Sequence, residues 1–295
     1  MLPKPYLQGA LASRLKAKQR RSTTIASHIP FVSLGDGETT MHFAHANAYP
    51  PQCYRRLLHA LGRENRVLAM EQRPLWDTDL DGFDSWEPMI EDQIEFLTHH
   101  AGNPVVAIGH SLGGVITLMA AARRPDLYSH LVLLDPVFLT GFKSQVLKLI
   151  PPRLRHIIHP YISGAKRRRF RWNDRDQAIK HFRSKNVFEA FDDQGIADLV
   201  DGGLVTDDDG LTLKFTREWE VRIYETVVCD PWKYLRKIEK PVYGLVGSKS
   251  DTLFDKAITR WRKHPHSVLD ELPYGHLFPM EVPEQTAAKI TGFLK

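Results

Sequence analysis

Cysteine is scarce in this sequence, and long apolar runs are missing. Only two cysteines occur in 295 residues, Cys53 and Cys229. Their wide separation favours two reduced thiols in a cytoplasmic protein over a structural disulfide. No apolar run reaches the roughly 18 residues that a membrane-spanning helix requires. The composition therefore argues against a disulfide-rich secreted domain and against a membrane-spanning protein.

Acidic residues are missing from residues 1–22, which carry only basic charges. Because this stretch has no apolar core of roughly 7–15 residues, we do not expect a secretory signal. An organelle transit segment is one interpretation. The one we favour is a solvated, partly helical basic arm over residues 1–27. The basic residues of this arm are Lys4, Arg14, Lys16, Lys18, Arg20 and Arg21.

Two kinds of binding motif are also missing. The cysteines and histidines are not clustered at the spacing of metal ligands, and no phosphate-cradling glycine loop of the P-loop type is present. We therefore expect neither a metal nor a cofactor.

The remaining composition is that of a globular protein. Hydrophobic residues make up 42% and charged residues 25%, with a formal net charge of +5, which suits one large domain. Short apolar stretches alternate with segments of helical periodicity. This alternation predicts an α/β fold, a mostly parallel twisted sheet with helices on both faces. The expected strands are 25–34, 39–44, 67–70, 105–109, 130–136, 241–247 and 267–269, and the expected helices are 53–61, 89–97, 115–122 and 283–294.

The strand–helix alternation is interrupted in the second half of the chain. From 137 to 237, helical pieces alternate with prolines and no clean parallel strand is visible, after which the alternation resumes. We therefore expect an inserted region made largely of helical pieces. The predicted organisation is a basic arm (1–27), a first core segment (28–136), the insert (137–237) and a second core segment (238–295).

One short stretch, Gly109-His110-Ser111-Leu112-Gly113, is the most informative part of the sequence. It joins an expected buried strand to an expected helix. Glycines at both ends allow the strand and the helix to approach closely, with Ser111 at the apex of a strained turn beside the free N–H groups of the helix. The alternative is a serine that only caps the helix.

In this context the stretch resembles the nucleophile elbow of the α/β-hydrolase family, and the resemblance covers about residues 28–295. It implies that the insert at 137–237 is a helical cap over the active site. It also implies that Ser111 is a nucleophile, followed in the chain by an acid and a histidine. Asp251 and His276 each follow an expected strand and are the residues that the resemblance assigns. Asp135, one strand earlier, is the alternative acid. A helix cap is the alternative role for Asp251.

The loop that begins at His45 also resembles a segment of this family. The resemblance implies that the backbone N–H groups of Asn47 and Leu112 form an oxyanion hole. Ala46 stands where glycine is usual, which changes the turn but keeps a backbone donor. We expect His45 to hold this loop in place, and His110 to pack or hydrogen-bond beside the serine.

Charge is unevenly distributed in the expected insert. Basic residues dominate from 143 to 185 and are densest at 166–172, whereas 191–210 has no Lys or Arg. Two interpretations stay open. In the first, the two stretches are solvated and neutralise each other. In the second, the basic stretch attracts an anionic substrate or an anionic membrane surface. We do not expect nucleic-acid binding, because one basic run without a known motif is weak evidence for it.

The resemblance implies a serine hydrolase that cleaves a carboxylic ester or thioester of a small acyl substrate through an acyl-enzyme. Family members that open epoxides or remove halide carry aspartate in place of Ser111, which argues against both reactions. Hydrolysis of a carbon–carbon bond is an alternative, because those members also use serine. A non-catalytic binding protein on the same scaffold is another. The sequence leaves the oligomeric state open.

Overall fold

The computed structural model describes residues 28–77, 79–138, 150, 160–226, 230–253 and 255–295. The basic arm and Cys229 lie outside these residues. The other cysteine, Cys53, is a buried free thiol. In the described part of the chain, no helix is both long enough and apolar enough to cross a lipid bilayer.

A seven-stranded sheet forms the centre of the described structure, in the order β1-β3-β2-β4-β5-β9-β10. Only β1 runs antiparallel to its neighbour, and the other pairs are parallel. The mostly parallel sheet predicted from the sequence is confirmed. The strands are β1 (Phe31–Leu34), β2 (Thr40–Ala44), β3 (Arg66–Met70), β4 (Val105–His110), β5 (Tyr128–Leu134), β9 (Val242–Gly247) and β10 (Ser267–Leu272).

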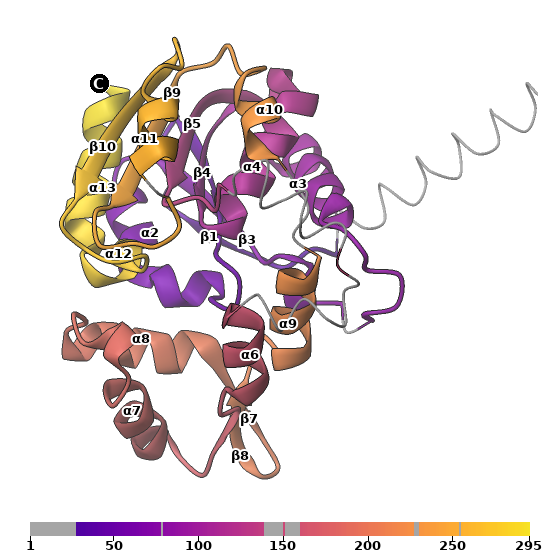
Figure 1. Cartoon of the computed structure of the whole chain (residues 1–295), viewed down its shortest axis with the longest axis vertical. Coiled ribbons are helices and arrows are strands. Elements are labelled where there is room, and N and C mark those ends of the chain that lie inside the picture. The colour runs from indigo at the N-terminus through magenta and orange to yellow at the C-terminus, as the bar shows by residue number, and fades with distance from the viewer. Residues whose placement is uncertain (1–27, 78, 139–149, 151–159, 227–229, 254) are drawn as a thin grey trace, which may run out of the picture.

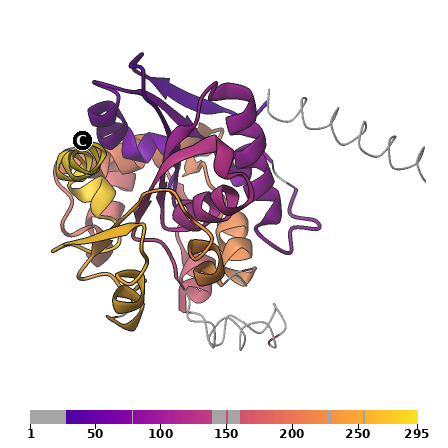
Figure 2. The same ribbon diagram turned by 90° about the horizontal axis from the view of Figure 1, so that it is seen from above.

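Helices cover both faces of this sheet, as Figures 1 and 2 show from two directions. One apolar core packs α3, α4, α10 and α11 on one face, and a second packs α2, α12 and α13 on the other. Every residue of β4 is buried, as expected for a central parallel strand covered on both faces. The helices are α2 (Arg55–Leu61), α3 (Glu87–His100), α4 (Leu112–Arg123), α10 (Pro231–Leu235), α11 (Asp255–Trp261), α12 (Phe278–Glu281) and α13 (Pro283–Leu294), with short 3-10 turns at η1 (Pro51–Tyr54), η2 (Arg73–Leu75) and η3 (Pro125–Leu127).

The register of the parallel strands aligns their carboxyl ends at one edge of the sheet. Gly109 of β4 pairs with Ala44 of β2 and with Leu133 of β5. Next to it, Leu134 of β5 pairs with Leu245 of β9. The loops that follow β2, β4, β5, β9 and β10 therefore all leave the sheet at this edge.

The inserted region forms a separate lobe below this edge in Figure 1. It contains helices, as predicted, and also a small antiparallel sheet of order β6-β8-β7 that the sequence reading did not predict. Asp174, Asp192 and Thr216 each accept a backbone N–H at a helix start, which fixes these starts. The elements are α6 (Pro160–Arg167), β6 (Arg171–Trp172), α7 (Arg175–Arg183), η5 (Asn186–Phe188), α8 (Asp193–Gly203), β7 (Leu204–Asp207), β8 (Gly210–Leu213) and α9 (Arg217–Glu225).

Ion pairs connect the basic and acidic stretches of this lobe. Arg171 lies 2.8 Å from Asp207, and Arg175 lies 2.7 Å from Asp201. These are the contacts that mutual neutralisation, the first of the two interpretations, requires. Because the pairs are exposed to solvent, they contribute little to stability.

Candidate active site

Ser111 lies between β4 and α4 in a strained backbone conformation. Its φ is 56° and its ψ is −116°, and its side chain makes no cap hydrogen bond to the helix that follows. The simple helix-cap interpretation is therefore wrong. Because a non-glycine residue rarely adopts positive φ, such strain persists only where the surrounding structure enforces it.

Two glycines make this turn possible, because backbone segments pack closely against both of them. A Cβ atom at Gly109 would lie 2.5 Å from the carbonyl oxygen of Gly113, and a Cβ atom at Gly113 would lie 2.2 Å from the carbonyl oxygen of Ala44. Neither position has room for a side chain. The glycine spacing read from the sequence thus reflects the close packing of β2, β4 and the start of α4.

His276 contacts both Ser111 and a carboxylate. Its Nε2 lies 3.0 Å from Ser111 Oγ, and its Nδ1 lies 2.5 Å from Asp135 Oδ2. The serine is 6% exposed and Asp135 is fully buried. The three side chains come from the loops after β4, β5 and β10, which the strand register brings to one edge. They form a continuous hydrogen-bonded row of hydroxyl, imidazole and carboxylate.

The carboxylate of Asp135 is held by further donors. Its Oδ1 accepts the N–H of Gly247 at 3.0 Å, and its Oδ2 accepts the hydroxyls of Ser250 at 2.5 Å and Thr252 at 2.7 Å. Burial alone would raise the pKa of Asp135, but the hydrogen bonds from His276, Ser250 and Thr252 outweigh burial and lower this pKa below its usual value. The carboxylate is therefore ionised at neutral pH.

Asp251, the acid expected from the sequence, is not brought to His276. Its side chain is exposed and accepts a short hydrogen bond from the hydroxyl of Tyr161, in α6. The structure places the alternative, Asp135, beside the imidazole instead. Asp135 follows Leu134 directly, and its N–H bonds to the carbonyl of Leu245 at 2.8 Å, which keeps its backbone at the edge of the sheet.

Asn47 and Leu112 lie in the two segments expected to supply an oxyanion hole. In the described structure, neither backbone N–H donates to another residue. The Asn47 side chain donates through Nδ2 to the carbonyl of Glu220 in α9 at 3.3 Å. His45 holds the same loop, as expected: its Nε2 accepts the N–H of Gln72 at 3.0 Å, and its carbonyl accepts Gln72 Nε2 at 2.6 Å.

Backbone strain is concentrated at this edge of the sheet. The non-glycine residues with positive φ in the described chain are Ser111, Asp135 and Ala48, the last of which follows Asn47 directly. Each belongs to one of the loops that carry the serine, the carboxylate and the candidate oxyanion donor. Such clustering is typical of a functional site.

His110 is fully buried and connects the loop of His276 with the loop of Asn47 through hydrogen bonds. Its Nδ1 lies 2.7 Å from the hydroxyl of Tyr54, and its Nε2 lies 2.9 Å from the carbonyl of His276. The Tyr54 hydroxyl also accepts the N–H of Ala46 at 3.3 Å. Burial lowers the pKa of His110 to about 3, so the ring is neutral and donates from Nε2. The expected hydrogen-bonding role of His110 is confirmed. Tyr54 has no local sequence signal and was missed.

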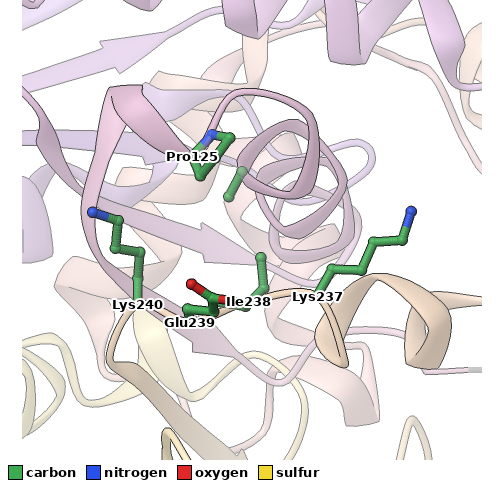
Figure 3. Close-up of a pocket in the computed structure, with 6 residues that line it drawn as sticks. Pro125, Lys237, Ile238, Glu239 and Lys240 are labelled. Carbon is green, nitrogen blue, oxygen red and sulfur yellow. The ribbon is translucent and has the colours of Figure 1, made fainter.

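A cavity of about 220 Å³ lies away from these residues (Figure 3). Pro125, which lines it, follows the end of α4, and Lys240 precedes β9. The cavity is therefore at the amino ends of the strands, opposite the edge that carries Ser111. Figure 3 shows Lys237 and Lys240 pointing away from each other. Because the cavity lies at the opposite end of the strands from Ser111, it is not a candidate for the active site.

None of the described residues form a group of three or more His, Cys, Asp or Glu side chains that could hold a metal ion. The site is thus described by its hydroxyl, imidazole, carboxylate and backbone donors.

Comparison with known proteins agrees with this architecture. The model of the "Alpha/beta hydrolase family" matches residues 43–289. The chain is 27% identical over 273 residues to the "Uncharacterized hydrolase YugF" of Bacillus subtilis (strain 168), covering 88% of this chain and 91% of that protein. It is 39% identical over 61 residues to a monoglyceride lipase of Rattus norvegicus, about 20% of each chain.

Solved structures show the same fold. The crystal structure of E-2-(acetamidomethylene)succinate hydrolase superposes with a TM-score of 0.74 at 20% sequence identity and covers 90% of this chain and 94% of that chain. At this identity the likeness concerns the fold alone, whereas the family match spans most of the sequence. The chain therefore belongs to the alpha/beta hydrolase family.

Proposed function

We propose that this protein is a serine hydrolase that cleaves a carboxylic ester or thioester through an acyl-enzyme, with Ser111, His276 and Asp135 as its triad. The observation that carries the proposal is the hydrogen-bonded row in which His276 lies 3.0 Å from Ser111 Oγ and 2.5 Å from Asp135 Oδ2. A serine hydroxyl is a weak nucleophile until a base removes its proton and a third group orients that base.

The reaction follows from this arrangement. Nε2 of His276 takes the proton of Ser111 as Oγ attacks the carbonyl carbon of the substrate. Asp135 accepts a hydrogen bond from Nδ1, which fixes the tautomer and stabilises the imidazolium that forms. The imidazolium then protonates the leaving alcohol or thiol, and an acyl group remains on Ser111. A water molecule, deprotonated by His276, releases the acid and restores the serine.

The negative oxygen of the tetrahedral intermediate needs donors that are already in place. The backbone N–H groups of Asn47 and Leu112 are the candidates, since neither is used within the described structure. Each such donor contributes about 3–4 kcal/mol to transition-state stabilisation in related chemistry. The contact between Asn47 and α9 would hold one donor in position from the side of the insert.

An ester or thioester is the substrate class we favour. The name of the rat relative, a monoglyceride lipase, supports it, although that alignment covers only 61 residues. The contacts of His276 with Ser111 and Asp135 are suited to acyl transfer. These contacts do not themselves select the acyl chain.

The test is covalent labelling. A fluorophosphonate probe should label the folded protein at Ser111, as located by mass spectrometry, and Ser111→Ala should abolish both labelling and hydrolysis of p-nitrophenyl acetate. The exposed Ser248 provides a control, and Ser248→Ala should label normally. A folded protein that is not labelled, and that turns over neither esters nor thioesters, would instead be a non-catalytic member of the fold.

A further inference from the structure

We propose that Tyr161 of the insert is a positioning residue for the triad: by binding Asp251, it holds the loop at 250–252 against the Asp135 carboxylate. This inference rests on the proposed function, because it assigns Asp135 to the triad. It also gives Asp251 a role other than that of the acid expected from the sequence.

The loop at 250–252 contacts Asp135 on one side and the insert on the other. The hydroxyls of Ser250 and Thr252 donate to Oδ2 of Asp135 at 2.5 and 2.7 Å. Asp251, between them, faces the insert and accepts the hydroxyl of Tyr161. The loop is also tied to itself, since the Ser250 and Thr252 hydroxyls lie 3.0 Å apart and the N–H of Thr252 lies 3.3 Å from Ser250 Oγ. A displacement of Asp251 must therefore displace both donors to Asp135.

Tyr161 is itself fixed by a second aromatic ring. It stacks on Tyr224 of α9, with ring centroids 5.8 Å apart and an interplanar angle of 25°. Tyr224 lies on α9 together with Glu220, whose carbonyl accepts Nδ2 of Asn47 at 3.3 Å. The helix that carries the second ring therefore also contacts the candidate oxyanion loop. Burial, with the adjacent Asp251, raises the pKa of Tyr161. The phenol therefore remains a hydrogen-bond donor at neutral pH.

The effect of this contact should be geometric. His276 Nδ1 and the two loop hydroxyls share the same oxygen, Oδ2 of Asp135. A small shift of the hydroxyls would change the direction in which Oδ2 faces the imidazole, and misplacement on the ångström scale near reacting groups is costly. Because Tyr161 acts through Asp251 and Asp135, its loss should lower kcat and leave KM nearly unchanged.

The chain provides a matched control pair. Tyr243 of β9 donates its hydroxyl to Asp270 at 3.0 Å and stacks on Phe293 with ring centroids 4.9 Å apart. This pair has the same chemistry as Tyr161 with Asp251, a tyrosine hydroxyl on an aspartate and a ring stacked on a second ring. In the described structure, no hydrogen bond or ring contact joins Tyr243 or Asp270 to the triad residues. Lys289 also contacts Oδ2 of Asp270, at 3.0 Å. Tyr243→Phe therefore removes a hydrogen bond of the same kind from a different place.

The experiment measures kcat, KM and fluorophosphonate labelling rates for full-length Tyr161→Phe, Asp251→Asn, Asp251→Ala, Tyr161→Phe/Asp251→Ala, Tyr243→Phe and Ser111→Ala. We expect Tyr161→Phe to lower kcat by about 10-fold with KM changed less than about twofold. Asp251→Asn keeps an acceptor oxygen and should fall between the wild type and Asp251→Ala. The double variant should be no worse than Asp251→Ala, because both changes break one contact. Tyr243→Phe should match the wild type.

Each other outcome counts against the inference. A kcat of Tyr161→Phe within twofold of the wild type would overturn it, as would multiplying effects in the double variant or an equal loss in Tyr243→Phe. The proposed function fails separately, if Ser111→Ala retains the wild-type rate. The downfield proton resonance of His276 Nδ1 gives a readout independent of turnover: it should shift in Tyr161→Phe and stay in place in Tyr243→Phe.

Discussion

Two aspartates follow neighbouring strands of the same sheet and have different environments. Asp135 follows β5 directly, is fully buried and contacts four donors: the imidazole of His276, the N–H of Gly247 and the hydroxyls of Ser250 and Thr252. Asp251 follows β9 after a short loop, is exposed and accepts the hydroxyl of Tyr161.

The difference shows that the position after a strand does not by itself select the acid. Asp135 adopts a φ of 43°, and this turn, one residue beyond β5, keeps its side chain close to the sheet edge where His276 lies. Asp251 lies four residues beyond the end of β9, and its carboxylate is therefore not held beside the imidazole of His276. The loop after β9 instead contributes the hydroxyls that hold Asp135, so both strand ends take part in forming one carboxylate site.

Replacing each of the two aspartates by asparagine should give the largest difference in kcat. Asp135→Asn should lower kcat by roughly 10³–10⁴-fold, because a neutral amide neither fixes the right tautomer of His276 nor stabilises its positive form. Asp251→Asn should cost less than roughly tenfold, since it changes only the Tyr161 contact. Ester turnover under saturating substrate measures both. If Asp251→Asn is the more damaging change, the assignment of the two residues is reversed.

The elbow was predictable because its signal is local. The spacing of Gly109 and Gly113, the apolar strand before them and the helical period after them are all visible in the sequence, and each corresponds to a backbone contact in the structure. The sheet was predictable for the same reason, since buried parallel strands are continuous apolar runs.

The acid and its partners were not predictable in this way. Choosing between Asp135 and Asp251 depends on the turn at residue 135 and on the hydroxyls of the loop after β9, which meet only through the sheet. Tyr54 and Tyr161 approach from other elements without any local pattern. The small sheet of the insert was missed because β6, β7 and β8 are two to four residues long. The pair Asp209-Gly210, with Gly210 at a φ of 124°, was an available hairpin signal.

A second prediction concerns His42, a buried polar side chain that lacks the hydrogen-bond partners that Asp135 has. Asp135 is buried with its oxygens bonded, whereas His42 is buried in β2 and neither ring nitrogen has a hydrogen-bond partner in the described structure. Burial lowers the pKa of His42 from 6.5 to about 3. The unfolded chain therefore binds more protons than the folded one between about pH 6.5 and pH 3, and stability falls as the pH decreases through this range.

His42→Leu should remove its share of this acid sensitivity. One such group costs about 2 kcal/mol of unfolding free energy between pH 6.5 and pH 5, and His45 and His110, with pKa values lowered to about 4 and about 3, should act in the same direction. Urea unfolding at pH 7 and pH 5 measures the change. The exposed His59 is the control, and His59→Gln should keep the full loss. Equal losses in His42→Leu and the wild type would show that His42 does not contribute.

The smallest expected effect concerns the two hydroxyls that distinguish the environments of the two aspartates. In Ser250→Ala/Thr252→Val, burial of Asp135 is opposed only by His276 and the N–H of Gly247, so the pKa of this carboxyl should rise. We expect kcat to fall by about 10-fold, which corresponds to roughly 1.4 kcal/mol. We also expect the acidic limb of the kcat–pH profile to move to higher pH.

Ser248→Ala is the control. It changes an exposed hydroxyl in the same loop and should leave kcat and the pH profile unchanged. An unaltered kcat and profile in the double variant would mean that His276 and the Gly247 N–H suffice to hold the carboxylate. The difference between Asp135 and Asp251 would then come from the burial of Asp135 and its distance from His276, without a contribution from the two hydroxyls.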